Sequence, residues 1–235
     1  MDNIVIGIEG LVGCGKTSIC RELLNKIPNS IVFHGGNLYR GIVYALMQSN
    51  KELSKNMKNL KSNIENIDIK KLMDDLQVEI KVENRETVIY VAGQKIDEEK
   101  LQSKEASMAV SIAGKSVDHT NLFIFARNFI NEFKEKYNII LSGRALNTIY
   151  PEINYHFLIT ASLEERVRRK AIQYGEHANL QGLEEHIKTR DGLQEKSGFY
   201  NLGKNTIKVD VTECKNAKES TDKVCEYIEE IKTLV

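Results

Sequence analysis

The chain lacks an excess of charge of either sign, and it lacks any long apolar run. Its 235 residues include 33 Lys and Arg against 33 Asp and Glu, so the formal net charge is zero. A protein that follows duplex DNA needs a clustered basic excess, so we expect no nucleic-acid polymer as a partner. No apolar run approaches the roughly 20 residues of a membrane-spanning helix, so we expect no membrane partner either.

Proline and cysteine are also scarce, and each scarcity excludes a class of protein. Pro28 and Pro151 are the only prolines, so no proline-rich linker divides the chain. The four cysteines form no Cys-x-x-Cys pair, and their spacing indicates neither a zinc site nor a disulfide framework. The N-terminal MDNIVIGIEG has no basic region and no long apolar core, so it is not typical of a signal peptide. We therefore expect a cytoplasmic protein.

Short apolar runs alternate with amphipathic stretches along much of the chain. Such runs, separated by helices, are typical of an α/β domain whose parallel sheet is covered on both faces. The predicted strands of this sheet are residues 3–8, 31–33, 139–143, 155–159 and 206–211. The predicted helices are residues 16–26, 37–48, 51–76, 103–136, 163–196 and 216–233. Ser162 and Glu165 predict a capping box at the start of the helix that follows them.

A different periodicity interrupts this pattern. VEIKVE (78–83) and TVIYVAG (87–93) alternate between apolar and polar residues, with a short polar segment between them. Alternation of this kind predicts a β-hairpin or a small antiparallel sheet. Because the hairpin lies inside the chain, we interpret it as part of an insertion in the parallel core.

One motif carries specific chemistry. GLVGCGKT (10–17) matches the P-loop or Walker A pattern GxxxxGK[ST], with a predicted strand before it and a helix after it. Such a loop folds its backbone N–H groups into a nest for phosphates at a helix N-terminus. Lys16 is expected to reach the β- and γ-phosphates, and the Thr17 hydroxyl to bind Mg²⁺. The predicted ATP-binding residues are Gly10, Leu11, Val12, Gly13, Cys14, Gly15, Lys16, Thr17 and Ser18.

Arginines near the ends of strands and helices indicate which kind of P-loop protein this is. Guanidinium groups bind phosphate oxygens in pairs and keep their charge. Transfer of a γ-phosphoryl group between two anionic partners needs several such clamps. The sequence has no guanine signature of the NKxD type, so a kinase is favoured over a GTPase. The arginines concerned are Arg40, Arg144, Arg166, Arg168, Arg169 and Arg190.

With these residues in view, the sequence resembles the bacterial cytidylate kinases, which are P-loop nucleoside monophosphate kinases. IGIEGLVGCGKTS (6–18) is similar to their IAIDGPAGSGKST, and HGGNLYRGIVYAL (34–46) to their DTGAMYR segment. SKEASMAVSIAG (103–114) resembles their EVxxxxS stretch, and LSGRALNTIYPE (141–152) resembles DGRDIGTVVFP. FLITASLEERVRRK (157–170) resembles FLTASxEERARRR, and EEHIKTRDGLQEKS (184–197) resembles IxxRDxxDxxR. The segments follow one another in the family order over nearly the whole chain.

The resemblance implies a fold and a division of the chain. The fold would be a P-loop three-layer sandwich with a central parallel sheet, a monophosphate-binding insertion of helices and antiparallel strands, and a helical lid. The lid would be mobile without ligand, and its arginines would gain partners only when a triphosphate binds. The implied boundaries are a core of 1–35, 131–163 and 201–235, an insertion of 36–130 and a lid of 164–200.

The resemblance also assigns roles to residues. The lid arginines would approach the transferring phosphoryl group, Glu9 would lie near Mg²⁺ through a water molecule, and the loop 212–217 would lie beside the adenine. The implied catalytic residues are Lys16, Arg144, Arg166 and Arg169. The implied metal-site residues are Thr17 and Glu9. The implied acceptor-binding residues are His34, Gly36, Tyr39, Arg40, Ser111, Arg144 and Arg190.

The sequence departs from the family pattern where a base and a ribose would be read. In place of DTGAMYR it has HGGNLYR, so that His34 and Gly35 replace an acid and a small hydroxyl residue. Ala145 replaces the aspartate of GRD, while Gln194 and Ser197 replace the second acid and the last arginine of RDxxDxxR. A site that has lost its hydrogen-bonding groups for a base no longer selects that base strongly. We therefore expect CMP itself to be a poor acceptor.

The sequence thus predicts an ATP- and Mg²⁺-dependent phosphotransferase that acts on a nucleoside monophosphate, CMP- or dCMP-like, or a related anionic small molecule. One alternative is a P-loop kinase of a non-nucleotide metabolite, because Arg40, Arg144 and Arg190 require an anion but no base. Another is a nucleotide-binding regulatory protein without turnover, which the loss of the acid at His34 favours. ATP and a small anionic acceptor are the expected partners, and a monomer or weak homodimer is the expected state.

Overall fold

The computed structural model describes residues 3–49, 69–102, 120–175, 179–198 and 202–228. The chain forms two compact units. We call Met1–Phe33 together with Glu132–Val235 the core unit, and His34–Asn131, which interrupts it in sequence, the insertion unit. Each unit is described by itself below.

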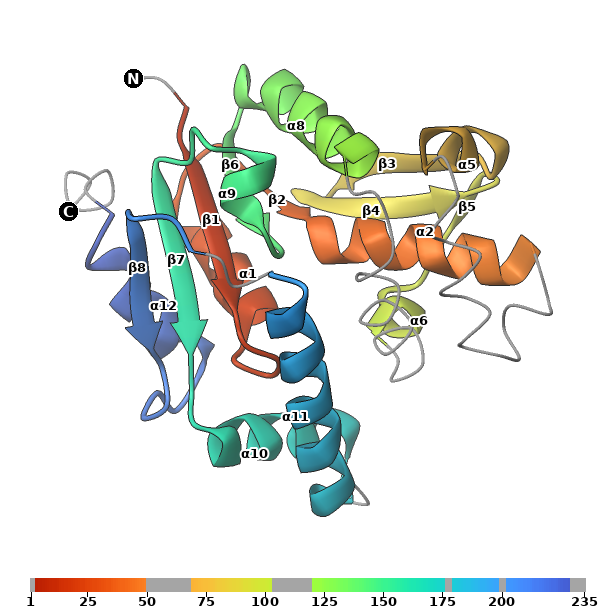
Figure 1. Cartoon of the computed structure of the whole chain (residues 1–235). Coiled ribbons are helices and arrows are strands. Elements are labelled where there is room, and N and C mark those ends of the chain that lie inside the picture. The colour runs from red at the N-terminus through yellow and green to blue at the C-terminus, as the bar shows by residue number, and fades with distance from the viewer. Residues whose placement is uncertain (1–2, 50–68, 103–119, 176–178, 199–201, 229–235) are drawn as a thin grey trace. The chain divides into compact units, whose positions relative to one another are not determined.

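A parallel sheet forms the centre of the core unit (Figure 1). β1 (Val5–Gly10) pairs in parallel with β6 (Asn138–Ser142) on one side and with β7 (Tyr155–Thr160) on the other, and β7 pairs in parallel with β8 (Thr206–Asp210). Each of these strands is five or six residues long. The strands, in spatial order, are β2 (Ser30–His34), β6 (Asn138–Ser142), β1 (Val5–Gly10), β7 (Tyr155–Thr160) and β8 (Thr206–Asp210). The predicted parallel sheet is therefore confirmed for β1, β6, β7 and β8, and β2 lies beside β6 in the same sheet.

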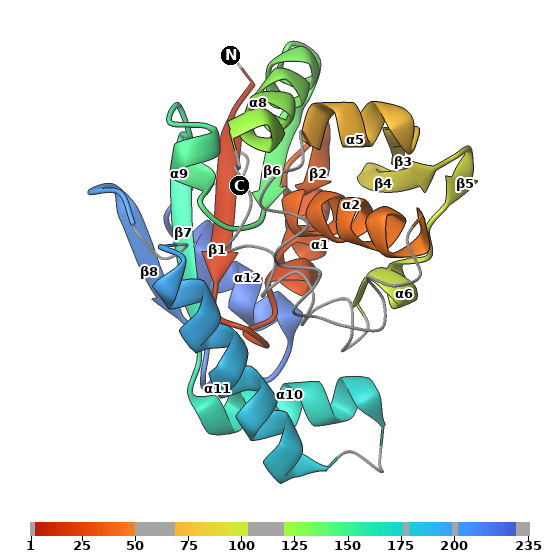
Figure 2. The same cartoon turned by 45° about the vertical axis from the view of Figure 1, so that its right-hand side comes forward.

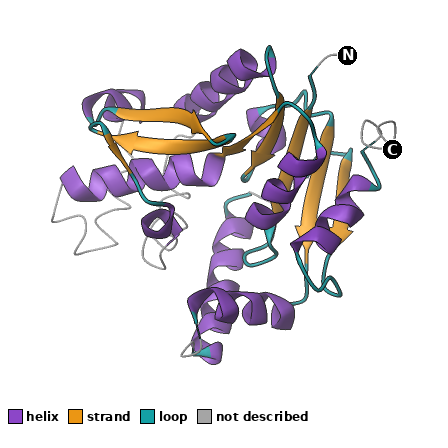
Figure 3. Cartoon of the chain, turned by 180° about the vertical axis from the view of Figure 1, so that it is seen from behind, coloured by secondary structure: helices purple, strands orange, loops and turns teal. Residues whose placement is uncertain are grey.

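Apolar side chains from the sheet and from two helices form one core cluster. α1 (Lys16–Lys26) and α12 (Ala217–Cys225) pack on each other, and Figure 3 shows helices in front of this face of the sheet. Phe157, at the middle of β7, is fully buried in the cluster. Its burial with the aliphatic side chains around it supplies the main driving force for folding this unit. The largest of these neighbours are Ile6, Ile8, Ile19, Leu23 and Ile140.

Three helices of the core unit lie near the carboxyl-terminal ends of its strands or in the loops between them. α9 (Leu146–Ile149) follows β6, and α10 (Leu163–Tyr174) follows β7. α10 packs against α11 (Leu180–Lys196), and Figure 2 shows the two helices beyond the ends of β1 and β7. Because ligands of open α/β sheets bind outside the carboxyl ends of the strands, these helices flank the expected site.

The insertion unit is built on one long helix and a β-hairpin. α2 (Gly35–Ser49) packs against β3 (Val78–Glu83) and β4 (Glu86–Val91), which pair in antiparallel register. Asn84 and Arg85, at φ angles of 48° and 66°, form the two-residue turn between the strands. Left-handed backbone at both positions is typical of the type I′ hairpin turn. The unit also contains α5 (Ile69–Asp75), β5 (Gln94–Lys95), α6 (Glu98–Gln102) and, at its end, α8 (Thr120–Lys134).

Several predicted boundaries were wrong, and most errors concern short or polar elements. Residues 163–196 are two helices, because the backbone at Gly175 has a φ of 90° that ends α10. Within the described residues α12 ends at Cys225, so the last helix is shorter than predicted. The sequence did not indicate β5, α6 or α9. The N-cap at Ser162 is confirmed, since the Ser162 hydroxyl accepts a hydrogen bond of 3.2 Å from the Glu165 amide. The reciprocal bond of a capping box is not formed, because the Ser162 amide donates to the Thr212 hydroxyl at 2.9 Å and the Glu165 carboxylate binds Arg168 and Arg169.

Two predictions fall largely outside the described residues. The polar segment 51–76 is described only from residue 69 onward, where α5 begins. Ser111 and the first part of the predicted helix 103–136 also lie outside the described ranges. In the part of the chain that is described, no helix has the length and apolar character needed to cross a membrane.

Candidate nucleotide-binding site

The loop between β1 and α1 has the backbone that phosphate binding requires. Gly13 and Gly15 have φ angles of 83° and 93°, in the left-handed region that glycine adopts without strain. Helical hydrogen bonding begins at once, as the Ile19 amide donates to the carbonyl of Gly15 at 3.0 Å. α1 starts at Lys16, so the first amides of this helix lack intrahelical partners and form a site for anions.

Lys16 curls back over the loop that precedes it. Its ammonium nitrogen lies 2.9 Å from the carbonyl oxygens of both Gly10 and Leu11, and 3.8 Å from the Cys14 sulfur. Burial, together with the nearby charge of Arg144, lowers the pKa of Lys16 to about 7. Arg190 acts in the same direction, more weakly. Burial and the two arginine charges thus disfavour the charged form of the P-loop lysine in the absence of a bound anion.

A buried ion pair attaches α10 and α11 to the P-loop. Arg166, only 7% exposed, pairs with Asp191 and donates to the carbonyl of Val12 at 3.1 Å. The second Asp191 oxygen accepts a hydrogen bond from the Val12 amide at 3.1 Å. We call these contacts the Arg166–Asp191 latch. Because the latch uses both the N–H and the C=O of Val12, it fixes the backbone orientation of the P-loop at this residue.

Arg169 makes a second connection, between the P-loop and the loop after β8. Its guanidinium donates to the carbonyls of Cys14 at 3.1 Å, Val211 at 2.7 Å and Cys214 at 3.2 Å. Glu165 accepts a hydrogen bond of 2.7 Å from Arg169 and two from Arg168, and these bonds, that of Arg168 first, lower the pKa of Glu165 to about 2. Arg166 and Arg169 therefore have partners already, which differs from the expectation that they acquire them only from a triphosphate.

Arg144 stands at the end of β6 in a loop that a buried acid holds in place. It donates to the side-chain oxygen of Gln194 at 3.0 Å and to the carbonyl of Gly143 at 2.9 Å. Ala145 has a left-handed φ of 53°, which bends the chain sharply after Arg144. The next amide, that of Leu146, donates to a Glu9 carboxylate oxygen at 2.6 Å. Glu9 thereby sets the path of the loop that carries Arg144.

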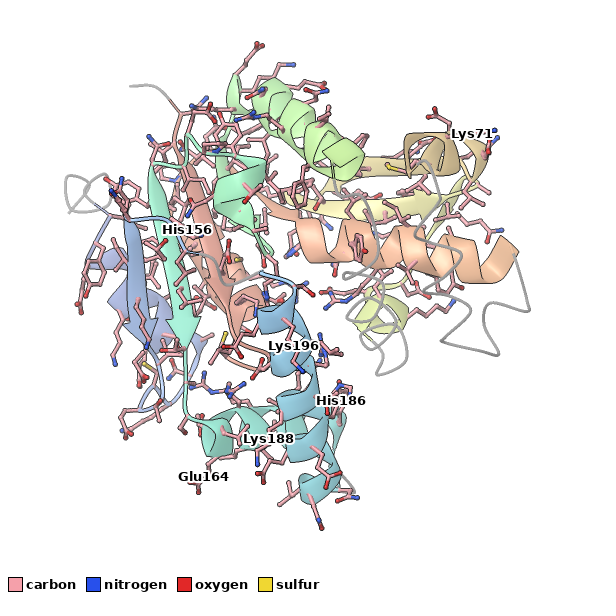
Figure 4. All side chains as sticks on the ribbon, viewed as in Figure 1. Lys71, His156, Glu164, His186, Lys188 and Lys196 are labelled. Atoms are coloured by element: carbon pink, nitrogen blue, oxygen red, sulfur yellow. The ribbon has the colours of Figure 1, made fainter. Side chains whose placement is uncertain are left out.

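Glu9 itself is 2% exposed and lies against His156 of β7; Figure 4 labels His156. The His156 Nε2 is 3.2 Å from the same Glu9 oxygen that accepts from Leu146. His156 Nδ1 lies 3.0 Å from the side-chain nitrogen of Asn147 and 2.7 Å from the Thr206 hydroxyl, whereas the buried Nε2 makes no hydrogen bond among the described residues. Among the described residues, the other Glu9 oxygen is buried and has no hydrogen-bond partner.

The remaining predicted residues belong to the insertion unit. His34 is buried, and its Nε2 lies 2.8 Å from a Glu86 oxygen on β4. Arg40 donates to the side-chain oxygen of Asn37 at 3.0 Å, and its guanidinium lies over Gly36, where a β-carbon would approach it to 3.6 Å. Burial raises the pKa of the Tyr39 phenol well above its usual range. These side chains gather at the N-terminal turn of α2.

The structure thus brings the core-unit part of the predicted site together: the P-loop, Glu9, Arg144, Arg166, Arg169 and Arg190. Sequence reasoning missed Asp191, His156 and Glu86. His156 left a readable signal, because a polar residue inside the buried strand run YHFLI must have a partner. Asp191 follows Arg190 directly and could have been considered with it. Glu86 left no such signal, because its role depends on which strand lies beside His34.

Comparisons with known proteins agree with this architecture. The family model described as Cytidylate kinase matches residues 6–233 of the chain. A cytidylate kinase of Halalkalibacterium halodurans is 24% identical, with 98% of this chain and 99% of that protein covered. Cytidylate kinases of Clostridium botulinum (strain Langeland) and Bacillus subtilis are 28% and 26% identical, with 97% and 96% of this chain covered and 99% and 96% of theirs. The chain therefore belongs to the cytidylate kinase family, and its activity is that of a phosphotransferase of the nucleoside monophosphate kinase type.

Proposed function

We propose that the protein transfers the γ-phosphoryl group of ATP to a nucleoside monophosphate, CMP- or dCMP-like, or to a related anionic small molecule. One observation carries the proposal. Lys16, Arg144 and Arg190 share one site at the P-loop, where burial first, and then the charges of the two arginines, lower the pKa of Lys16 to about 7. Unbalanced positive charge of this kind favours a ligand with several negative charges, as two phosphate-bearing substrates would supply.

ATP would bind along Gly10–Ser18, with the lysine released from the Gly10 and Leu11 carbonyls to the β- and γ-phosphates. Mg²⁺ fits the residues at this place. Thr17 supplies a hydroxyl at the start of α1, and the buried Glu9 oxygen without a partner supplies an acidic acceptor for a metal-bound water. Held there, Mg²⁺ would supply positive charge that compensates the charge of the phosphates.

The protein's own part in the reaction is positioning and charge compensation. Arg144 and Arg190 would hold the acceptor phosphate, in bidentate fashion, opposite the γ-phosphoryl group. Arg166 and Arg169 would hold the backbone of the P-loop through their hydrogen bonds to the carbonyls of Val12 and Cys14. Because Arg169 already contacts the loop, it would also be close enough to bind a phosphate placed in it. Transfer needs no covalent enzyme intermediate and no strong base, because the transition state is stabilised by its surroundings.

The groups near the acceptor make CMP a poor substrate in this proposal. Gln194, buried where the family pattern has an acid, offers a neutral amide and already accepts from Arg144. The Ser197 hydroxyl donates to the carbonyl of Leu193 at 2.8 Å, within its own helix. A pocket that no longer presents charged partners to a base or ribose discriminates by shape and phosphate charge alone.

A panel of acceptors assayed with Mg·ATP tests the proposal. We expect ADP release that depends on an added nucleoside monophosphate, with kcat/KM for CMP no higher than for dCMP, UMP or AMP. Lys16→Ala should lower kcat by about 10²–10³, the loss typical of one preorganised donor, without changing the thermal midpoint of unfolding. Turnover with phosphorylated metabolites alone would favour a kinase of a non-nucleotide substrate, and tight ATP binding without turnover on any acceptor would favour a regulatory protein.

A further inference from the structure

His34 occupies a position where side chains of α/β proteins meet their ligands. It is the last residue of β2, and Gly35 and Gly36 begin α2 directly after it. Its side chain is only 7% exposed, yet its ring is polar and must have partners. Within the insertion unit these partners come from a single place, the start of β4.

Two neighbouring residues of β4 hold His34, one by its backbone and one by its ring. The Thr87 hydroxyl accepts a hydrogen bond of 2.9 Å from the His34 amide. The Glu86 carboxylate lies 2.8 Å from His34 Nε2. The Glu86 side chain is 23% exposed, whereas Thr87 is buried at 4% exposed. The tight turn at Asn84 and Arg85 determines where β4 starts, so it also determines where Glu86 stands.

This arrangement bears on the departure from the family pattern at His34. The segment HGGNLYR has an imidazole where DTGAMYR has a carboxylate. A carboxylate is nevertheless present at this end of β2, because Glu86 of β4 places one beside it. The imidazole of His34 lies between the backbone of β2 and that carboxylate. The negative charge at this end of β2 is therefore kept, although the residue that provides it is different.

We propose that Glu86 takes over the role of the missing acid and acts through His34 as a positioning residue for the phosphoryl acceptor, an inference that rests on the proposed function. Glu86 accepts from Nε2 and so fixes the plane of the ring. Nδ1 then has a defined direction, and the hydrogen bonds of His34 within the described residues are made by its backbone amide and by Nε2, not by Nδ1. The proposal requires that an acceptor bound at the first turn of α2, where the Arg40 guanidinium lies over Gly36, meets that nitrogen.

A purely structural role for this pair has different consequences. Exposed and half-buried ion pairs contribute little to stability, and a pair that only joins β4 to β2 could be replaced without any effect on substrate binding. A positioning role requires that changes at Glu86 act on the acceptor and not on ATP. It also requires that His34 and Glu86 depend on each other, because two carboxylates at this distance would repel.

Steady-state kinetics of four variants test this. They are Glu86→Gln, His34→Asp, the double variant, and the control Glu79→Gln, whose carboxylate is 54% exposed and pairs with Lys81 on β3. We expect Glu86→Gln to raise the KM of the acceptor about tenfold with the KM of ATP unchanged, as for a lost charged hydrogen bond. His34→Asp should lose more, and the double variant should regain most of the loss. Additive effects of the two substitutions, or an unchanged acceptor KM with a lower melting temperature, would overturn the proposal.

The ¹⁵N chemical shifts of the His34 ring, measured during nucleotide titrations, test the positioning role of Glu86 independently of whether the proposed reaction occurs. CMP, dCMP, UMP and AMP are the probes, each added to the wild type and to Glu86→Gln. A probe that shifts Nδ1 in the wild type and less in the variant supports the positioning role, even if no probe is phosphorylated and the proposed reaction fails. Turnover with no response of Nδ1 overturns the positioning role and leaves the reaction standing. If no probe binds or reacts, both are overturned.

Discussion

The depressed pKa of Lys16 predicts that nucleotide binding takes up a proton. In the free protein, burial and the neighbouring charges of Arg144 and Arg190 hold the pKa of this lysine at about 7 instead of its ordinary 10.5. A neutral amine still has two N–H groups, which match the two carbonyls, of Gly10 and Leu11, that it contacts at 2.9 Å. Bound phosphates would balance the excess charge and restore the ordinary pKa, so the complex binds more protons than its components.

The size of the effect follows from these two values. At pH 8 a group with a pKa of about 7 is about 9% protonated, whereas one at 10.5 is almost fully protonated, so binding takes up about 0.9 proton. At pH 6 the lysine is charged in both states, and the uptake falls to about 0.1. Since the complex holds the extra proton, affinity falls as pH rises between 7 and 10.5. The dissociation constant should rise about ninefold from pH 8 to 9 but only about twofold from pH 6 to 7.

Titration calorimetry with a non-hydrolysable ATP analogue measures this uptake directly. At pH 8 and saturating Mg²⁺ the nucleotide itself does not titrate, so the binding enthalpy should vary with the ionisation enthalpy of the buffer, with a slope of about 0.9 proton. Lys16→Met should abolish the slope. Lys188→Met should leave it unchanged, because Lys188, which lies on α11 (Figure 4), is 60% exposed and pairs with Glu184.

The outcome that would refute this reasoning is tight binding in the wild type with an enthalpy that is the same in every buffer. Lys16 would then be charged in the free protein, and the site would not carry the excess of positive charge inferred from its geometry. A slope that persists in Lys16→Met would instead assign the proton to another group.

Two further predictions concern the latch and the core. Asp191→Asn removes the charge that Arg166 pairs with, so α10 and α11 should exchange their amide hydrogens faster and the KM of ATP should rise. The control Glu184→Gln, on the exposed side of α11, should change neither quantity. Equal exchange in the wild type and in Asp191→Asn would show that the latch does not hold these helices. Phe157→Ala should lower the free energy of unfolding, measured in urea titrations, by about 3–5 kcal/mol. Ile172→Ala should lower it by less than about 0.5 kcal/mol, because Ile172 is 68% exposed. Similar losses for both variants would contradict the central place of Phe157 in the core.

The parallel sheet and the P-loop could be predicted from the sequence because each depends on local features. A short β-branched run such as VIGI must be buried on both faces, and a glycine-rich turn between such a strand and a helix has few alternatives. The break between α10 and α11 could also have been predicted from local sequence features, although the sequence analysis predicted one continuous helix there. Gly175 ends one helix, and the Asn179 side chain caps the next by accepting from the Gly182 amide at 3.1 Å.

The contacts that complete the site could not be predicted in this way. Asp191 reaches Val12 across 179 residues of sequence, and Glu86 reaches His34 across 52. Periodicity shows which face of an element is buried but not which other element lies against that face. The family resemblance drew attention to His34 because an acid was absent there, and only the position of β4 shows that Glu86 supplies one.

The latch changes the physical account of the lid arginines. A guanidinium group has five N–H donors, and burial without acceptors would cost several kcal/mol, so a buried arginine such as Arg166 must bind carbonyls or carboxylates when no phosphate is present. Arg166 and Arg169 do so at the backbone of the P-loop itself, through Val12 and Cys14. Phosphate would therefore not recruit these groups from solvent, but would compete with carbonyls for donors already aimed at the loop. The entropy of ordering these side chains is lost on folding and not at binding, which favours a site preorganised for the charge that develops during transfer.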